Sequence, residues 1–111
     1  MSQSANNIVW RGGVAVITGA ASGIGEAMAR YAASDQGMKV VLADIAAQPL
    51  HQLAAELSSQ GCDVLAVTTD VADAASMSAL AEKTQNHFGD VTLLINNAGI
   101  ETLGFSWEIP A

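Results

Sequence analysis

Three glycines near the start of the chain have the residue type and spacing to bind a charged ligand. Gly19, Gly23 and Gly25 form the pattern G-x-x-x-G-x-G within the stretch AVITGAASGIGEAM. Glycine lets a strand-to-helix turn adopt positive φ and lets backbone N–H groups approach a phosphate, which the positive end of a helix attracts. The turn therefore predicts a site for a phosphate-bearing ligand.

The spacing of these glycines excludes one large class of phosphate-binding protein. A P-loop needs lysine followed by serine or threonine after its last glycine, and Glu26 and Ala27 stand there. The pattern also differs from G-x-G-x-x-G, because Met28 occupies the place of the third small residue. Taken alone, the turn is also compatible with an alternative interpretation, in which it is only a tight strand-to-helix connection and binds no ligand.

Four apolar runs predict the strands that position this turn. They are Val14–Thr18, Lys39–Ala43, Asp63–Thr69 and Val91–Asn96. Their hydrophobicity is nearly continuous instead of alternating, which is typical of parallel strands covered on both faces.

Helical spacing of apolar residues predicts a helix after each of the first three strands. The expected apolar stripes are Ile24, Ala27, Met28, Tyr31 and Ala32, then Leu50, Leu53, Ala54 and Leu57, then Met77, Leu80, Ala81, Thr84 and Phe88. Left-handed C-caps are expected at Gly37, Gly61 and Gly89. Pro49 suits a first helical turn, and Asp73 or Asp70 is expected to cap the third helix.

The element order β-α-β-α-β-α-β predicts an α/β fold with a Rossmann-like, doubly wound parallel sheet. In such a sheet, ligands bind at the carboxyl ends of the strands, where the strand order reverses. We expect a polar leader over residues 1–10 and a single domain over residues 11–111.

Charge and cysteine content narrow the function further. Four lysines and arginines stand against eleven acidic residues, which gives a net charge of −7 and no basic patch for nucleic acid or an anionic membrane. Cys62 is the only cysteine, so an internal disulfide is excluded and a cytoplasmic location is favoured. His51 and His87 have no partners at metal-ligand spacing, and we expect no metal site.

Four motifs in order resemble those of the short-chain dehydrogenase/reductase family. They are TGAASGIG (Thr18–Gly25), LAD ending at Asp44, DV (Asp70–Val71) and NNAG (Asn96–Gly99), and the resemblance extends over residues 11–100. It implies the amino-terminal half of such an enzyme, with an incomplete NAD(P)-binding domain that is truncated after the fourth strand.

The resemblance also implies a role for each position. Asp44 would accept hydrogen bonds from the adenosine ribose and repel the extra phosphate of NADP, and neither Ser22 nor Ile45 is basic, so NAD is expected over NADP. Asp70 would face adenine, with helix capping as the alternative, and Asn96 would tie strand ends together. The full set of predicted cofactor-binding residues is Gly19, Ser22, Gly23, Ile24, Gly25, Asp44, Ile45, Asp70, Val71, Asn97, Ala98 and Gly99.

Catalysis in the family uses a tyrosine, a lysine four residues later, a serine and a further asparagine. Tyr31 is the only tyrosine of this chain, and Asp35 stands four residues after it. We therefore expect no catalytic residue here and an inactive chain, the nucleotide-binding part of an NAD-dependent alcohol dehydrogenase or carbonyl reductase. Its substrate would be a small alcohol or carbonyl compound, and the full-length enzyme a homo-oligomer.

An alternative stays open at this point: a short, non-catalytic protein that binds NAD or a partner. The fourth strand carries Leu93, Leu94 and Ile95, and without a neighbouring strand it would be an exposed apolar edge. We expect such a chain to be marginally stable or prone to aggregation.

Overall fold

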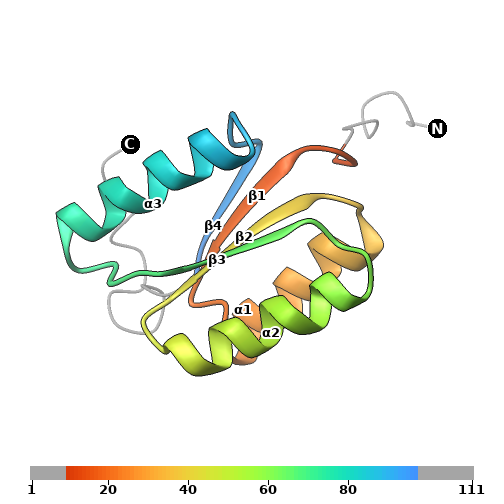
Figure 1. Ribbon diagram of the computed structural model, residues 1–111, viewed down its shortest axis with the longest axis horizontal. Coiled ribbons are helices and arrows are strands. Elements are labelled where there is room, and N and C mark those ends of the chain that lie inside the picture. The colour runs from red at the N-terminus through yellow and green to blue at the C-terminus, as the bar shows by residue number, and fades with distance from the viewer. Residues whose placement is uncertain (1–9, 98–111) are drawn as a thin grey trace.

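The computed structural model describes residues 10–97 as a four-stranded parallel sheet with helices on both faces (Figure 1). The strands are β1 (Val14–Thr18), β2 (Lys39–Asp44), β3 (Val64–Thr68) and β4 (Leu93–Asn96). The helices are α1 (Gly23–Arg30), a π-helical turn η1 (Tyr31–Asp35), α2 (Ala47–Ser59) and α3 (Ala74–His87). The predicted Rossmann-like α/β architecture is confirmed.

The strand order is β3-β2-β1-β4, with all neighbours parallel. Ala15 of β1 stands opposite Val40 of β2 on one side and Leu93 of β4 on the other. The chain moves outward from β1 to β3, and α3 then carries it back to the other side of β1. Strand order therefore reverses beside β1, and the carboxyl ends of all four strands meet at one edge of the sheet.

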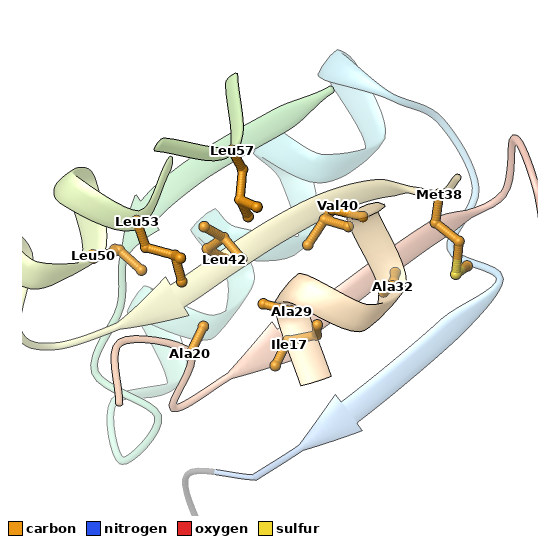
Figure 2. Packing of buried hydrophobic residues seen from close by; sticks show 12 residues of the cluster. Ile17, Ala20, Ala29, Ala32, Met38, Val40, Leu42, Leu50, Leu53 and Leu57 are labelled. Carbon is orange, nitrogen blue, oxygen red and sulfur yellow. The ribbon is translucent and has the colours of Figure 1, made fainter. Parts of the chain in front are cut away.

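One face of the sheet packs on α1 and α2 (Figure 2). Ile17 and Leu42 point from the sheet toward these helices and are fully buried. The predicted stripe of α2 is confirmed, because Leu50, Leu53 and Leu57 are all buried against this face.

The other face of the sheet packs on α3, which lies across the sheet from α1 and α2 (Figure 1). Val16, Val41 and Val67 are buried here together with Leu80. Burial on both faces explains the continuous hydrophobicity of β1 and β2 in the sequence.

The predicted apolar stripe of the first helix is wrong except at Ala32, which is buried. Ile24 is 66% exposed and Tyr31 is 56% exposed, and Met28 is exposed as well. The buried face of α1 and η1 is made of small residues, namely Gly25, Ala29, Ala32 and Ala33. Small side chains let the helix lie close to the sheet, so at this position the size of the residues decided which face is buried.

Helix ends follow the predicted signals. Gly37, Gly61 and Gly89 all have left-handed φ, between 67° and 98°. The N-cap of α3 is Asp73, whose carboxylate accepts a hydrogen bond from the N–H of Ala75 at 3.3 Å. Of the two candidates for this cap, Asp73 is therefore the residue used.

The ends of the chain lie outside this description. Residues 1–9 of the predicted leader are not among the described residues, and Trp10 packs, half-buried, against the core. The predicted boundary between residues 10 and 11 stays a prediction. Within residues 10–97, no helix is long and apolar enough to cross a membrane.

Candidate functional site

A cleft of about 360 Å³ opens at the carboxyl ends of the strands. Its lining comes from the segments that follow β1, β2, β3 and β4: Gly19, Ser22, Gly23, Ile24, Asp44, Ile45, Thr69, Asp70, Val71 and Asn97. The structure thus brings together every predicted site residue within residues 10–97 except Gly25. Ala98 and Gly99 lie outside the described residues.

The turn after β1 has the backbone shape that the glycines predict. Gly19 has a φ of 65° and Gly23 a φ of 59°, both in the left-handed region. A Cβ atom at Gly23 would meet no atom within 4 Å, so this glycine borders open space in the cleft. Ser22 is the N-cap of α1, but its side chain makes no capping hydrogen bond. The first turn of α1 therefore borders the cleft without a side-chain cap, and the free N–H groups of a helix N-terminus are a common binding site for anions.

Gly25 serves the packing of this turn and not the lining of the cleft. A Cβ atom there would overlap the carbonyl oxygen of Gly19 and would lie 2.8 Å from the Nδ2 atom of Asn97. Only glycine lets α1 begin this close to the turn and to the end of β4. Its predicted contact with a cofactor stays a prediction, while the close helix packing expected of a third glycine is present.

Asp44 is anchored at the end of β2 by two backbone groups. Its Oδ2 atom accepts a hydrogen bond from the N–H of Ala21 in the glycine turn, at 3.0 Å. Its Oδ1 atom accepts one from the N–H of Ala46 at 2.9 Å. A carboxylate offers about four lone-pair positions, so acceptor capacity remains on both oxygens for the hydroxyl groups of a ligand.

The ends of β1 and β4 are tied together by side chains. The hydroxyl of Thr18 donates to the Oδ1 atom of Asn96 at 3.0 Å, which agrees with the predicted role of Asn96. Asn97 donates from Nδ2 to the carbonyl oxygen of Gly19 at 3.2 Å. Asn97 therefore supports the glycine turn from β4 while it lines the cleft.

Asp70 shapes the loop after β3 without capping α3. Its Oδ1 atom accepts a hydrogen bond from the N–H of Ala72 at 2.9 Å, and its own N–H donates to the hydroxyl of Ser76 at 2.8 Å. The capping alternative left open for Asp70 is therefore not the role it has, since Asp73 is the N-cap. Its carboxylate stays exposed at the cleft.

Sequence reasoning missed Thr69, which also lines the cleft. It is buried, its hydroxyl donates to the carbonyl oxygen of Val67 at 2.8 Å, and its N–H donates to the carbonyl oxygen of Asp44 at 3.0 Å. The available signal was its position as the last residue of a predicted parallel strand, beside Asp70.

The electrostatics of the cleft are acidic. Among residues 10–97, Asp44 and Asp70 are the only ionisable residues in its lining. Arg30 lies elsewhere and bridges α1 to α2, with its Nη1 atom 2.6 Å from Glu56 and its Nη2 atom 2.8 Å from Glu26. The hydrogen bond from Arg30 lowers the pKa of the exposed Glu56 carboxyl, while Glu56 and Glu26 raise the pKa of Arg30. This network joins two helices away from the cleft, whose lining in the described part of the chain contains no cation.

A parallel α/β sheet with a glycine turn after its first strand and a carboxylate at the end of its second defines a Rossmann-like protein. Comparison with known proteins makes the assignment specific. The family model described as short chain dehydrogenase matches residues 13–110, and the chain belongs to this family.

Individual relatives agree with the family. The chain is 43% identical over 97 residues to the CLA biosynthesis dehydrogenase/reductase of Lactiplantibacillus plantarum, covering 87% of this chain and 34% of that protein. It is 44% identical over 99 residues to 1-deoxy-11-beta-hydroxypentalenate dehydrogenase of Streptomyces exfoliatus, covering 86% of this chain and 35% of that protein. The chain thus spans about a third of the length of these relatives.

Solved structures show the same fold. A short chain dehydrogenase/reductase from Burkholderia phymatum in complex with NAD matches with a TM-score of 0.76 and 42% identity, over 78% of this chain and 31% of that one. L-Sorbose reductase from Gluconobacter frateurii, complexed with NADPH and L-sorbose, matches with a TM-score of 0.76 and 41% identity, over 80% and 34%. Similar structures therefore hold either nicotinamide cofactor.

Proposed function

We propose that the cleft binds NAD and that the chain is the nucleotide-binding part of an oxidoreductase that interconverts an alcohol and a carbonyl compound. The observation that carries this proposal is the position of Asp44, which ends β2 and contacts the glycine turn through Ala21. When bound, the nicotinamide cofactor supplies the site that accepts or donates hydride. The relatives of the family are named as dehydrogenases and reductases, which supports this reaction class.

The described residues fit the nucleotide in a definite order along the cleft. The pyrophosphate would meet the N-terminus of α1 at Gly23, where the backbone is open. Asp44 would bind the adenosine ribose hydroxyls. The adenine would lie beside Asp70, between the apolar side chains of Ile45 and Val71, which are 66% and 37% exposed. Asn97 would support the nicotinamide half from the end of β4.

The charge of the cleft favours NAD over NADP. The extra phosphate of NADP would approach Asp44, and the residues that the structure describes in the lining include no cation to offset the repulsion. Two unit charges 4 Å apart interact by roughly 1 kcal/mol in water and about 4 kcal/mol near a protein surface. Because about 1.4 kcal/mol is a tenfold change in affinity, we expect NADH to bind at least tenfold more tightly than NADPH.

The 111-residue chain lacks the tyrosine and lysine pair that the family uses for catalysis. The chain contains no tyrosine followed four residues later by lysine, since Tyr31 is its only tyrosine. A phenol with a nearby lysine is the acid and base that hydride transfer to a carbonyl needs in this family. We therefore propose that this chain alone binds the nucleotide without oxidising or reducing a substrate. Its substrate class, the homo-oligomeric state of a full-length enzyme and a cytoplasmic location remain predictions.

The experiment is a titration of the chain with NADH and with NADPH, followed by energy transfer from tryptophan to the nicotinamide and by calorimetry. The proposal expects a preference for NADH that falls sharply in Asp44→Asn. Asp63→Asn is a matched control, because it removes the same charge from the opposite end of the strands and should leave the preference intact. Equal affinity for the two nucleotides, or an equal loss of preference in both variants, would contradict the NAD assignment.

A further inference from the structure

The glycine turn is held to the end of β2 by two consecutive N–H groups. The N–H of Ala20 donates to the carbonyl oxygen of Ala43 at 3.1 Å, and the N–H of Ala21 donates to the carboxylate of Asp44 at 3.0 Å. Ala20 is fully buried, and Ala21 is half-buried. The first acceptor is a backbone carbonyl, which any residue at position 43 would supply. The second acceptor is the side chain of Asp44.

The side chain of Asp44 is also held by a second hydrogen bond, on its other carboxylate oxygen. The second oxygen of Asp44 accepts the N–H of Ala46, directly before α2 begins at Ala47. The carboxylate therefore bridges the glycine turn, 23 residues earlier in the chain, to the start of α2. Its orientation does not require a bound ligand, because both backbone donors belong to the protein.

The flexibility of the glycine turn explains why such a bridge would stabilise it. Gly19 and Gly23 flank Ala21, and both hold left-handed φ, in a residue type that has the widest backbone freedom. Ordering such residues costs conformational entropy, and a charge-assisted hydrogen bond to the residue between them restricts the turn to one shape.

We propose that Asp44 is a positioning residue for the pyrophosphate as well as the group that selects NAD. By holding Ala21 it fixes the turn that presents the N–H groups of α1, so nucleotide choice and phosphate binding depend on one carboxylate. This inference rests on the proposed function and deepens it. It follows that substitution of Asp44 alone does not convert the cleft to NADP, because the variant that removes the repulsion also releases the turn.

The inference predicts the sign of a charge effect. Removing a negative charge from an acidic cleft should raise its affinity for an anion. Asp70→Asn removes one negative charge and leaves the hydrogen bonds of the glycine turn intact, because the carboxylate of Asp70 accepts a hydrogen bond from Ala72 in its own loop. Asp44→Asn removes the same charge from the same cleft but leaves one acceptor oxygen for two backbone donors, and Asp44→Ala leaves none.

The experiment measures binding of inorganic pyrophosphate to the 111-residue chain by calorimetry, together with amide hydrogen exchange in the absence of any ligand. We expect Asp70→Asn to bind pyrophosphate at least as tightly as the wild type. Asp44→Ala should bind it tenfold more weakly or worse, and Asp44→Asn should also lose affinity despite its lower charge. The amide of Ala21 should exchange at least tenfold faster in Asp44→Ala, while amides of Val41 and Leu42 keep their protection.

Unchanged exchange at Ala21 in both variants, or tighter pyrophosphate binding in Asp44→Asn matching that of Asp70→Asn, would overturn the inference. So would a wild-type chain with no measurable affinity for pyrophosphate. Loss of amide protection at Leu42 would show that a variant does not fold. In that case the inference is tested by NMR on the wild-type chain. There, the Ala21 amide proton shift must follow the titration of the Asp44 carboxyl carbon, and an independent shift refutes the bridge. The exchange readout contains no nucleotide, so it stands even if NADH and NADPH bind equally and the proposed function fails.

Discussion

Replacing Gly25 by alanine tests how closely α1 must approach the glycine turn. Gly25 lies in the first turn of α1 and is buried, and a Cβ atom there would overlap the carbonyl oxygen of Gly19. The overlapped atom belongs to the backbone, so no flexible side chain can move aside. Relief requires α1 to move away from the turn, or the turn to change shape.

Two effects of opposite sign compete in this variant. Alanine is favoured over glycine inside a helix by about 1 kcal/mol. Overpacking a close contact costs about 1–3 kcal/mol and sometimes more, and a clash with fixed backbone belongs at the upper end. We therefore expect Gly25→Ala to lower the free energy of unfolding by about 2 kcal/mol.

Urea unfolding followed by circular dichroism measures this difference. With a slope of about 1–3 kcal/mol per molar for a small protein, the midpoint should fall by roughly 1 M. Ala27→Gly is the matched variant, because Ala27 is exposed on the same helix and reports the helix propensity alone, an expected loss of about 1 kcal/mol. A Gly25→Ala variant as stable as the wild type, or more stable, would refute the packing argument.

Three further predictions concern other parts of the fold. Asp73→Ala removes the N-cap of α3 and should cost about 1 kcal/mol, with faster amide exchange in the first turn of that helix; an unchanged urea midpoint would contradict this. The hydrogen bond from Arg30 lowers the pKa of Glu56 below its ordinary value of 4.5, so its contribution to stability is present above pH 4.5 and is lost as the pH falls through the lowered pKa. The midpoint difference between wild type and Glu56→Gln should therefore be small, because the pair is exposed, and should vanish in acid; a difference that grows in acid would be inconsistent with this sign. Leu94 is 53% exposed on β4, and Leu94→Lys should reduce self-association in light scattering with little loss of stability; equal scattering from both proteins would show that this edge is not responsible.

The sheet was predictable because its strands carry a strong, simple signal. Val14–Thr18 is identical in prediction and structure, and the other predicted strands differ by at most two residues at an end. The largest difference is at β4, which begins at Leu93 instead of Val91. The preceding residue, Thr92, contacts Val14 through both its N–H and its hydroxyl oxygen without joining the strand.

The burial of α1 was not predictable from apolar periodicity. The pattern favoured Ile24 and Met28 as inward residues, and both are exposed. What decides the buried face is the close approach of α1 to the turn after β1, where a Cβ atom at Gly25 would overlap the carbonyl oxygen of Gly19. The buried residues of α1 are accordingly the small ones, Gly25 and Ala29. Ile24 instead lines the cleft. A stripe of small residues was present in the sequence, but hydrophobicity alone ranks it below its larger neighbours.

The candidate site was largely predictable because parallel strands carry their ends to one edge. The positions after β1, β2 and β3 could be placed by counting from strand ends, and Asp44 and Asp70 do line one cleft. The hydrogen bonding could not be predicted from the sequence. Only the structure shows which aspartate caps α3 and that Asp44 accepts a hydrogen bond from the N–H of Ala21. Both depend on side-chain direction, which spacing along the sequence does not determine.

A map of where NAD binds to this chain tests the assignment of the cleft most directly. Amide chemical shifts recorded as NAD is added should change at the carboxyl ends of the strands, at Gly19, Gly23, Asp44 and Asp70. The hollow at the opposite end of the strands, near Gly37 and Gly61, should remain unaffected. Shift changes centred on that opposite hollow, or none at saturating NAD, would contradict the assignment of this cleft as the nucleotide site.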